Sequence, residues 1–173
     1  MVHPSSEKDG MLQDRITQNA EALGMPYPGF DSPERRRTCD ESVRRRATRV
    51  LGDMLQQIAS LDAYLARENA PQHRAALAAA RGSAESLSDK IQSVPYSFAP
   101  LFQVVFLPLD IQRRLADDDL IIIEAIAELE RFLEPTLGEN TGFGALIERA
   151  ESLIEALDKC IEDRVSTIME FAG

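Results

Sequence analysis

Apolar residues recur at intervals of three and four along most of this chain, which is the periodicity of amphipathic α-helices. The first such segment predicts a helix from about residue 6 to residue 23, with Gly24 placed where a left-handed C-terminal cap would stand. The following stretch, MPYPGFDSP, is predicted to be a loop because its prolines and glycine disfavour regular structure. We expect residues 1–31 to form this N-terminal helix and loop, and residues 32–173 to form the helical bundle of a single globular unit.

The second predicted helix is long and has two possible starts. Ser32 followed by Pro33 is a suitable N-cap and first-turn pair, whereas Thr38 with Glu41 fits a capping box. From there the helix is expected to continue to about Asn69 along one apolar stripe, formed by Val43, Ala47, Val50, Met54, Ile58, Leu61 and Leu65. Pro71 then suits the first turn of a further helix that extends to about residue 94. Because the connection is short, these two helices should form an antiparallel hairpin.

Residues 94–111, VPYSFAPLFQVVFLPLDI, depart from the amphipathic pattern because they are apolar almost all round. A short helix that is apolar on every side is usually buried, so we expect a central helix here, kinked at Pro108. Phe98, Phe102 and Phe106 are spaced by four in this segment. They are candidates for core packing or, alternatively, for an interface with a partner or a second copy.

A third stripe begins at Ile111 and is interrupted by Asp117, Asp118 and Asp119. The triplet falls where the stripe needs an apolar residue, so we expect the helix to break and restart there with carboxylates at its N-terminal end. A last long helix is predicted from about residue 143 to residue 171, with a clean apolar stripe. The fold expected is an all-α, largely antiparallel bundle of five to six helices, two of them long.

Charge is distributed unevenly over the 173 residues, whose formal net charge is −10. Residues 1–93 contain 13 basic and 13 acidic side chains, whereas residues 94–173 contain 6 and 16. We do not expect an acidic chain to coat nucleic acid nonspecifically or to adsorb to anionic lipid. With two cysteines, no signal-peptide pattern and no long apolar run, we expect a cytoplasmic protein with no disulfide framework and no membrane span.

An arginine-rich segment stands out against this acidic background, at residues 35–49. It contains seven arginines and two acidic residues: the arginines are Arg35, Arg36, Arg37, Arg44, Arg45, Arg46 and Arg49. Guanidinium groups match phosphate oxygens, so one interpretation is a phosphate-binding or nucleic-acid-binding surface. Two others are pairing with the acidic second half, within or between chains, and contact with a membrane surface. No aromatic residue for base stacking lies between Phe30 and Tyr64, which favours pairing.

Residues 67–73, RENAPQH, place Arg67 six residues before His73. This spacing resembles the arginine–histidine motif of HEPN-type ribonucleases, which are all-helical and cleave RNA with the two residues meeting at a dimer interface. The resemblance covers seven residues and implies Arg67 and His73 as a catalytic pair. It departs from the family pattern at Glu68, where a small polar residue is usual, and at Pro71 within the motif. An ordinary polar turn is the alternative interpretation.

No other arrangement of side chains suggests catalysis, a cofactor or a metal ion. Glu148, Glu151, Glu155, Asp158 and Glu162 follow one another on a single predicted helix, so they cannot converge on one ion. We therefore expect a non-enzymatic interaction or regulatory module that self-associates through apolar helix faces. The alternative is a nucleic-acid-binding or RNA-processing protein that uses the arginine segment.

Overall fold

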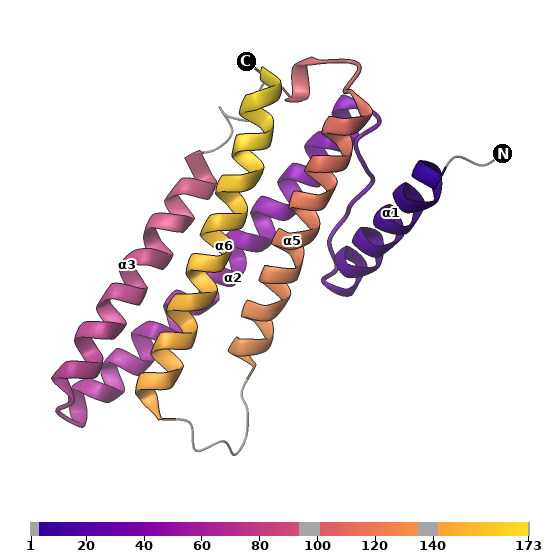
Figure 1. Ribbon diagram of the computed structural model, residues 1–173. Helices are drawn as coiled ribbons and strands as arrows, with labels where there is room; N and C mark the ends of the chain where they lie inside the picture. The colour runs from indigo at the N-terminus through magenta and orange to yellow at the C-terminus, as the bar shows by residue number, and fades with distance from the viewer. Residues whose placement is uncertain (1–3, 94–100, 135–141, 173) are drawn as a thin grey trace.

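The computed structural model describes residues 4–93, 101–134 and 142–172, and all regular structure within these ranges is helical (Figure 1). The long elements are α1 (Pro4–Ala22), α2 (Pro33–Arg67), α3 (Pro71–Ser93), α5 (Leu109–Leu133) and α6 (Phe143–Ala172). Residues 101–103 are also helical. The prediction of an all-α bundle is confirmed. The longest helices are α2, with 35 residues, and α6, with 30.

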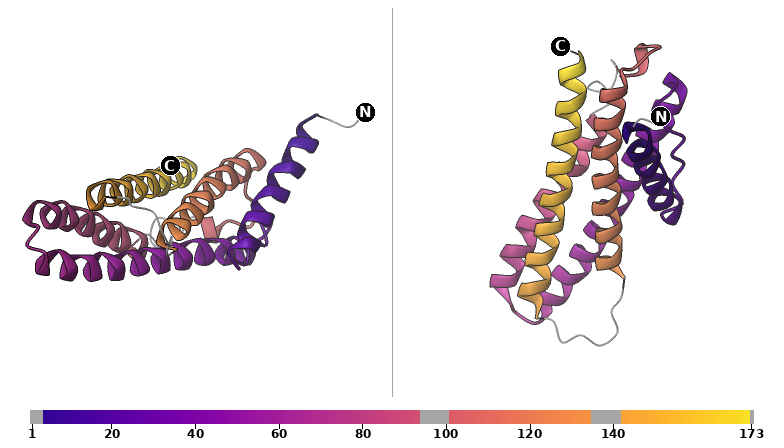
Figure 2. Two further views of the ribbon diagram at one scale, coloured as in Figure 1. Left: turned by 90° about the horizontal axis from the view of Figure 1, so that it is seen from below. Right: turned by 45° about the vertical axis from the view of Figure 1, so that its right-hand side comes forward.

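Two antiparallel hairpins, α2–α3 and α5–α6, pack against each other to form the bundle (Figure 1). Between the hairpins α2 contacts α5 and α3 contacts α6, and each of these pairs runs in the same direction. The N-terminal helix α1 lies outside the four, against α5 (Figure 2). One end of the bundle therefore collects the start of α2, the start of α5 and the end of α6.

The connection between α1 and α2 closes the core on one side. Gly24 has φ +63°, and the amide of Met25 donates to the carbonyl of Ala20 over 2.8 Å, as in a glycine-terminated helix. Beyond this turn the chain has no regular structure, as predicted, yet Met25, Tyr27 and Phe30 are buried. The loop thus contributes to the same continuous core as the helices.

Of the two starts predicted for α2, the structure has the earlier one. Ser32 is extended, and its hydroxyl accepts a hydrogen bond from the amide of Arg35 over 3.3 Å, while Pro33 occupies the first turn. Thr38 lies inside the helix and donates its hydroxyl to the carbonyl of Glu34. The helix ends at Arg67, and Asn69, with φ +53°, turns the chain into α3.

The prediction of a central kinked helix over residues 94–111 is wrong for the part that the structure describes. After residues 101–103 the chain is irregular to Pro108, which serves as the N-cap of α5. Proline lacks an amide hydrogen and disfavours helical geometry in the residue before it, so the helix starts after Pro108 rather than bending there. Phe98 lies outside the described residues, as does the rest of 94–100.

The predicted helix break at the aspartate triplet is also wrong. Helix α5 runs without interruption from Leu109 to Leu133 through Asp117, Asp118 and Asp119. Asp119 occupies the apolar stripe and is completely buried, whereas Asp117 is exposed. The helix continues because a charge from another helix neutralises Asp119, which removes the reason for a break. Within the described residues no helix has the length and apolarity needed to cross a membrane.

Candidate functional site: a buried ion-pair network and the arginine face

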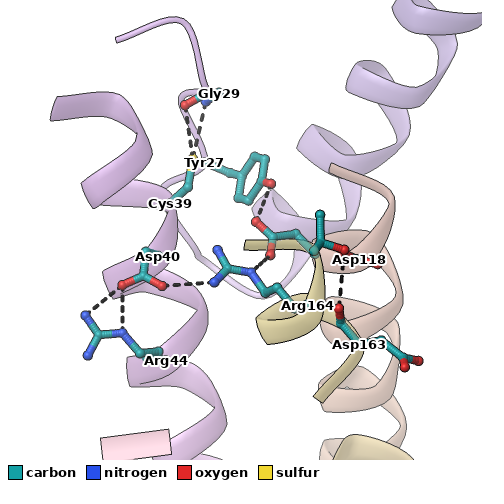
Figure 3. Close-up of polar contacts among 10 residues, drawn as sticks. Tyr27, Gly29, Cys39, Asp40, Arg44, Asp118, Asp163 and Arg164 are labelled. Carbon is teal, nitrogen blue, oxygen red and sulfur yellow. Dashed lines mark hydrogen bonds and ion pairs between the residues drawn. The ribbon is translucent and has the colours of Figure 1, made fainter. Parts of the chain in front are cut away.

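A network of five charged or polar side chains lies toward the end of the bundle where α2 and α5 begin, and four of the five are buried. Arg164 of α6 is 1 % exposed, and its Nε donates to Oδ1 of Asp119 on α5. Its Nη1 lies 3.1 Å from Oδ1 of Asp40 on α2, and both carboxylates are fully buried (Figure 3). One guanidinium therefore bridges two helices that come from different hairpins.

The outer oxygens of both carboxylates are also satisfied. Tyr27, from the α1–α2 loop, donates its hydroxyl to Oδ2 of Asp119 over 2.6 Å. Arg44, one turn along α2, donates from Nε to Oδ2 of Asp40 over 2.7 Å (Figure 3). Two guanidiniums thus face two carboxylates, and the cluster balances its own charge, as buried ionic groups require.

Burial and charge act against each other in this network. Burial alone would lower the pKa of the Arg164 guanidinium, but the adjacent Asp119 and Asp40 carboxylates outweigh it and raise that pKa. Burial raises the pKa of the Asp119 carboxyl, and the Arg164 guanidinium and Tyr27 hydroxyl oppose that rise. Burial, followed by the Asp119 charge, raises the pKa of Tyr27 well above its ordinary value. Tyr27 therefore stays a neutral donor.

Two neighbouring contacts extend the network. Thr167 of α6 donates its hydroxyl to Oδ2 of Asp118 over 2.6 Å, and burial raises the pKa of that half-buried carboxyl. The Cys39 thiol lies against Gly29, whose amide is 3.3 Å from the sulfur. Burial raises the pKa of this thiol to about 12, so Cys39 is protonated and lacks the thiolate needed for nucleophilic chemistry. These features make the cluster a structural connection between elements.

Most of the sequence-predicted arginine surface is engaged within the molecule. Arg36 is buried and donates to the carbonyls of Phe30 and Val104, which ties the two loops at this end together. Burial lowers the pKa of Arg36. Arg35 pairs with Asp31 over 2.9 Å, and the guanidinium of Arg37 lies 5.5 Å from the ring centre of Phe102.

The remaining arginines divide into two pairs. Arg44 belongs to the buried network, and Arg46 pairs with Glu130 of α5 over 2.5 Å. Arg45 and Arg49 are exposed, and neither takes part in an ion pair with the residues that the structure describes. The arginine segment therefore contributes both to intramolecular pairing and to a smaller exposed basic surface.

Arg67 and His73 lie on either side of the α2–α3 turn and are not brought into contact. Arg67 is the last residue of α2 and is exposed. The His73 ring packs instead toward Phe143 at the start of α6, with 6.5 Å between ring centres, and Tyr64 contacts the same phenylalanine. Within one chain this arrangement gives His73 a packing role.

The predicted interface phenylalanines have different environments. Phe102 is half-buried beneath Arg37, whereas Phe106 is 76 % exposed. On α6, the acidic ridge is partly paired, because Lys90 of α3 contacts both Asp158 and Glu162. No cluster of histidine, cysteine and carboxylate side chains suited to a metal ion occurs among the described residues.

The sequence analysis does not predict the ion-pair network, although two residues of the apolar stripes indicate it. Asp119 and Arg164 each occupy an apolar stripe position of a long amphipathic helix, and their charges are opposite. A lone charge on a buried stripe is costly, so two such positions of opposite sign indicate a pair. Arg164 stands between Ile161 and Ile168 in the stripe of α6.

No family model, no curated protein sequence and no solved structure matches this chain.

Proposed function

We propose that the chain is a non-catalytic helical module that self-associates through an apolar patch at the start of α5. The patch consists of Val105, Phe106 and Leu109, which are 83 %, 76 % and 63 % exposed. Neighbouring large apolar side chains in water are characteristic of surfaces that bind other proteins. Their exposure is the single observation that carries this proposal.

A hollow beside the patch gives a partner side chain a place to insert. Leu109 lines a cavity of about 140 Å³ between α1 and α5. Its other walls are the apolar Leu12, Phe30 and Ala116 and the polar Gln13, Gln112 and Arg113. Met169, near the end of α6, is 55 % exposed. The end of α6 and the start of α5 lie at the same end of the bundle (Figure 1). An exposed apolar surface beside a hollow with both apolar and polar walls resembles a protein interface, which has an apolar centre and a polar rim.

A second copy of the chain is the occupant that this surface fits most simply. In a twofold dimer the same patch serves both partners, so apolar groups need no separate complementary surface. Each copy would bring its Phe106 to the other's patch. The buried polar network supports the non-catalytic part of the proposal, because its donors and acceptors face one another rather than an open cavity.

The test is the association state of the purified chain, measured by sedimentation equilibrium from low to high micromolar concentration. We expect reversible dimerisation, and Phe106→Ser should weaken it tenfold or more, since burying a phenylalanine contributes about 1.5–3 kcal/mol. Ile121→Ser is the matched control, because Ile121 is also on α5 and 52 % exposed but lies far along the helix from the patch. A wild-type chain that stays monomeric throughout, or equal weakening by both variants, would overturn the proposal.

A further inference from the structure

One face of α2 presents a row of hydrogen-bond donors beside the α1–α2 turn. Ser42, Arg45, Arg46 and Arg49 are spaced by three, one and three residues, so they lie on the same side of the helix. They line a hollow of about 160 Å³ whose remaining walls are Gly24, Met25 and Pro26. Among the described residues no carboxylate lines this hollow, although the chain as a whole carries a net charge of −10.

The guanidiniums of Arg45, Arg46 and Arg49 differ in whether a carboxylate pairs with them. The ion pair with Glu130 fixes Arg46, whose side chain is mostly buried. Arg45 and Arg49 are exposed and four residues apart, and among the described residues no carboxylate pairs with either. Like charges at this spacing repel each other, so an anion bound between them would remove an unfavourable interaction as well as add favourable ones.

The surroundings limit an anion to the side of the helix that faces the α1–α2 turn. A larger hollow of about 580 Å³ on the other side of Arg46 and Arg49 includes Asp53, Glu130 and Glu134, whose charges would repel it. A third hollow, of about 430 Å³, extends from Arg45 and Arg49 toward the end of α3, and Glu41 is the one carboxylate that lines it in the part of the chain that the structure describes. Arg45 and Arg49 thus border two adjoining spaces in which basic side chains predominate.

We propose that Ser42, Arg45, Arg46 and Arg49 form a binding site for the phosphate group of a small ligand that carries one or two phosphates. Guanidinium groups donate paired hydrogen bonds that match the geometry of phosphate oxygens, and the Ser42 hydroxyl adds a neutral donor. The first phosphate occupies the hollow beside Pro26, and a second extends past Arg45 and Arg49 toward α3. This site lies on α2, away from the apolar patch, and its existence does not depend on self-association.

The experiment is isothermal titration calorimetry with inorganic phosphate and with pyrophosphate, at constant ionic strength set with potassium chloride. We expect saturable binding, tighter for pyrophosphate. Replacing both Arg45 and Arg49 with glutamine should weaken it tenfold or more, and Ser42→Ala a few-fold. Higher salt should also weaken binding, because the site is open to solvent.

The control is the pair Arg74→Gln and Arg81→Gln, which removes the same charge from exposed ion-paired positions on α3. This variant should bind as the wild type does. No saturable binding at millimolar pyrophosphate would overturn the proposal, and so would equal weakening in the control, which would indicate diffuse electrostatic attraction. Tight binding of single-stranded RNA without binding of pyrophosphate would also overturn it, in favour of an extended nucleic-acid surface.

Discussion

Replacing Arg164 with methionine would remove the guanidinium that neutralises two buried carboxylates while keeping an unbranched side chain. Asp40 would retain Arg44, but Asp119 would be left buried with only the Tyr27 hydroxyl as a donor. Both carboxylates are fully buried, so water cannot replace the lost partner. Breaking a buried pair from one side costs about 3–5 kcal/mol, a large part of the stability of a small domain.

A second substitution separates lost charge pairing from lost packing. In Arg164→Met combined with Asp119→Leu, the uncompensated charge is gone and the remaining pair, Asp40 with Arg44, is neutral. The free energy of unfolding is then lowered by about 1–3 kcal/mol, because the buried Tyr27 hydroxyl has lost its acceptor. The double variant should therefore be more stable than the single variant, although it changes twice as many core residues.

The assay is urea denaturation followed by far-ultraviolet circular dichroism at neutral pH and one fixed protein concentration. Arg81→Met is the control, because it breaks an exposed pair with Glu85 and should leave the unfolding midpoint unchanged. A loss of less than about 1 kcal/mol in the free energy of unfolding of Arg164→Met would contradict this prediction, and so would a double variant less stable than the single one.

Two further predictions concern the start of α2. The Cys39 thiol has a folded-state pKa of about 12 against an ordinary 9.0, so only the unfolded chain releases this proton between those values. The free energy of unfolding should therefore fall by about 1.4 kcal/mol per pH unit above pH 9 because of this thiol. The urea midpoint of Cys39→Ala should decline less steeply with pH than that of the wild type. Equal slopes for the two proteins would contradict this prediction. Ser32→Ala should destabilise the fold by about 1 kcal/mol, because the amide of Arg35 loses the hydroxyl that accepts its hydrogen bond. In thermal melts, Thr38→Ala should lower the melting temperature less than Ser32→Ala does. The reverse order would favour a start of α2 at Thr38.

The long helices were predictable from the sequence because apolar residues recur at intervals of three and four in each of them, and this periodicity does not depend on which element the helix packs against. The sequence predicted two possible N-caps for α2, Ser32 and Thr38, and the structure has Ser32 as the N-cap, followed by Pro33. Packing of the stripes buries them, so local periodicity is enough to locate these elements.

What local patterns could not provide is the pairing of distant charges. Asp119 is 45 residues from Arg164, and Asp40 is 124 residues from it. A rule based on neighbouring residues treats a charge on a stripe as a break, which led to the wrong prediction at the aspartate triplet. The apolar composition of 94–111 left both burial and an interface open for Phe106, and it could not show that the chain is irregular before Pro108, where Phe106 is 76 % exposed.

The bridge from Arg164 to two helices has a consequence for how the hairpins align. Apolar stripes are nearly uniform along their length, so by themselves they would tolerate a shift of α6 by one turn, about 5.4 Å. After such a shift Cys160 or Ile168 would face Asp40 and Asp119 in place of Arg164, and both carboxylates would lose their counter-charge. Arg164 therefore fixes the register of α6 against α2 and α5, because an alignment shifted by one turn would leave both buried carboxylates without a counter-charge.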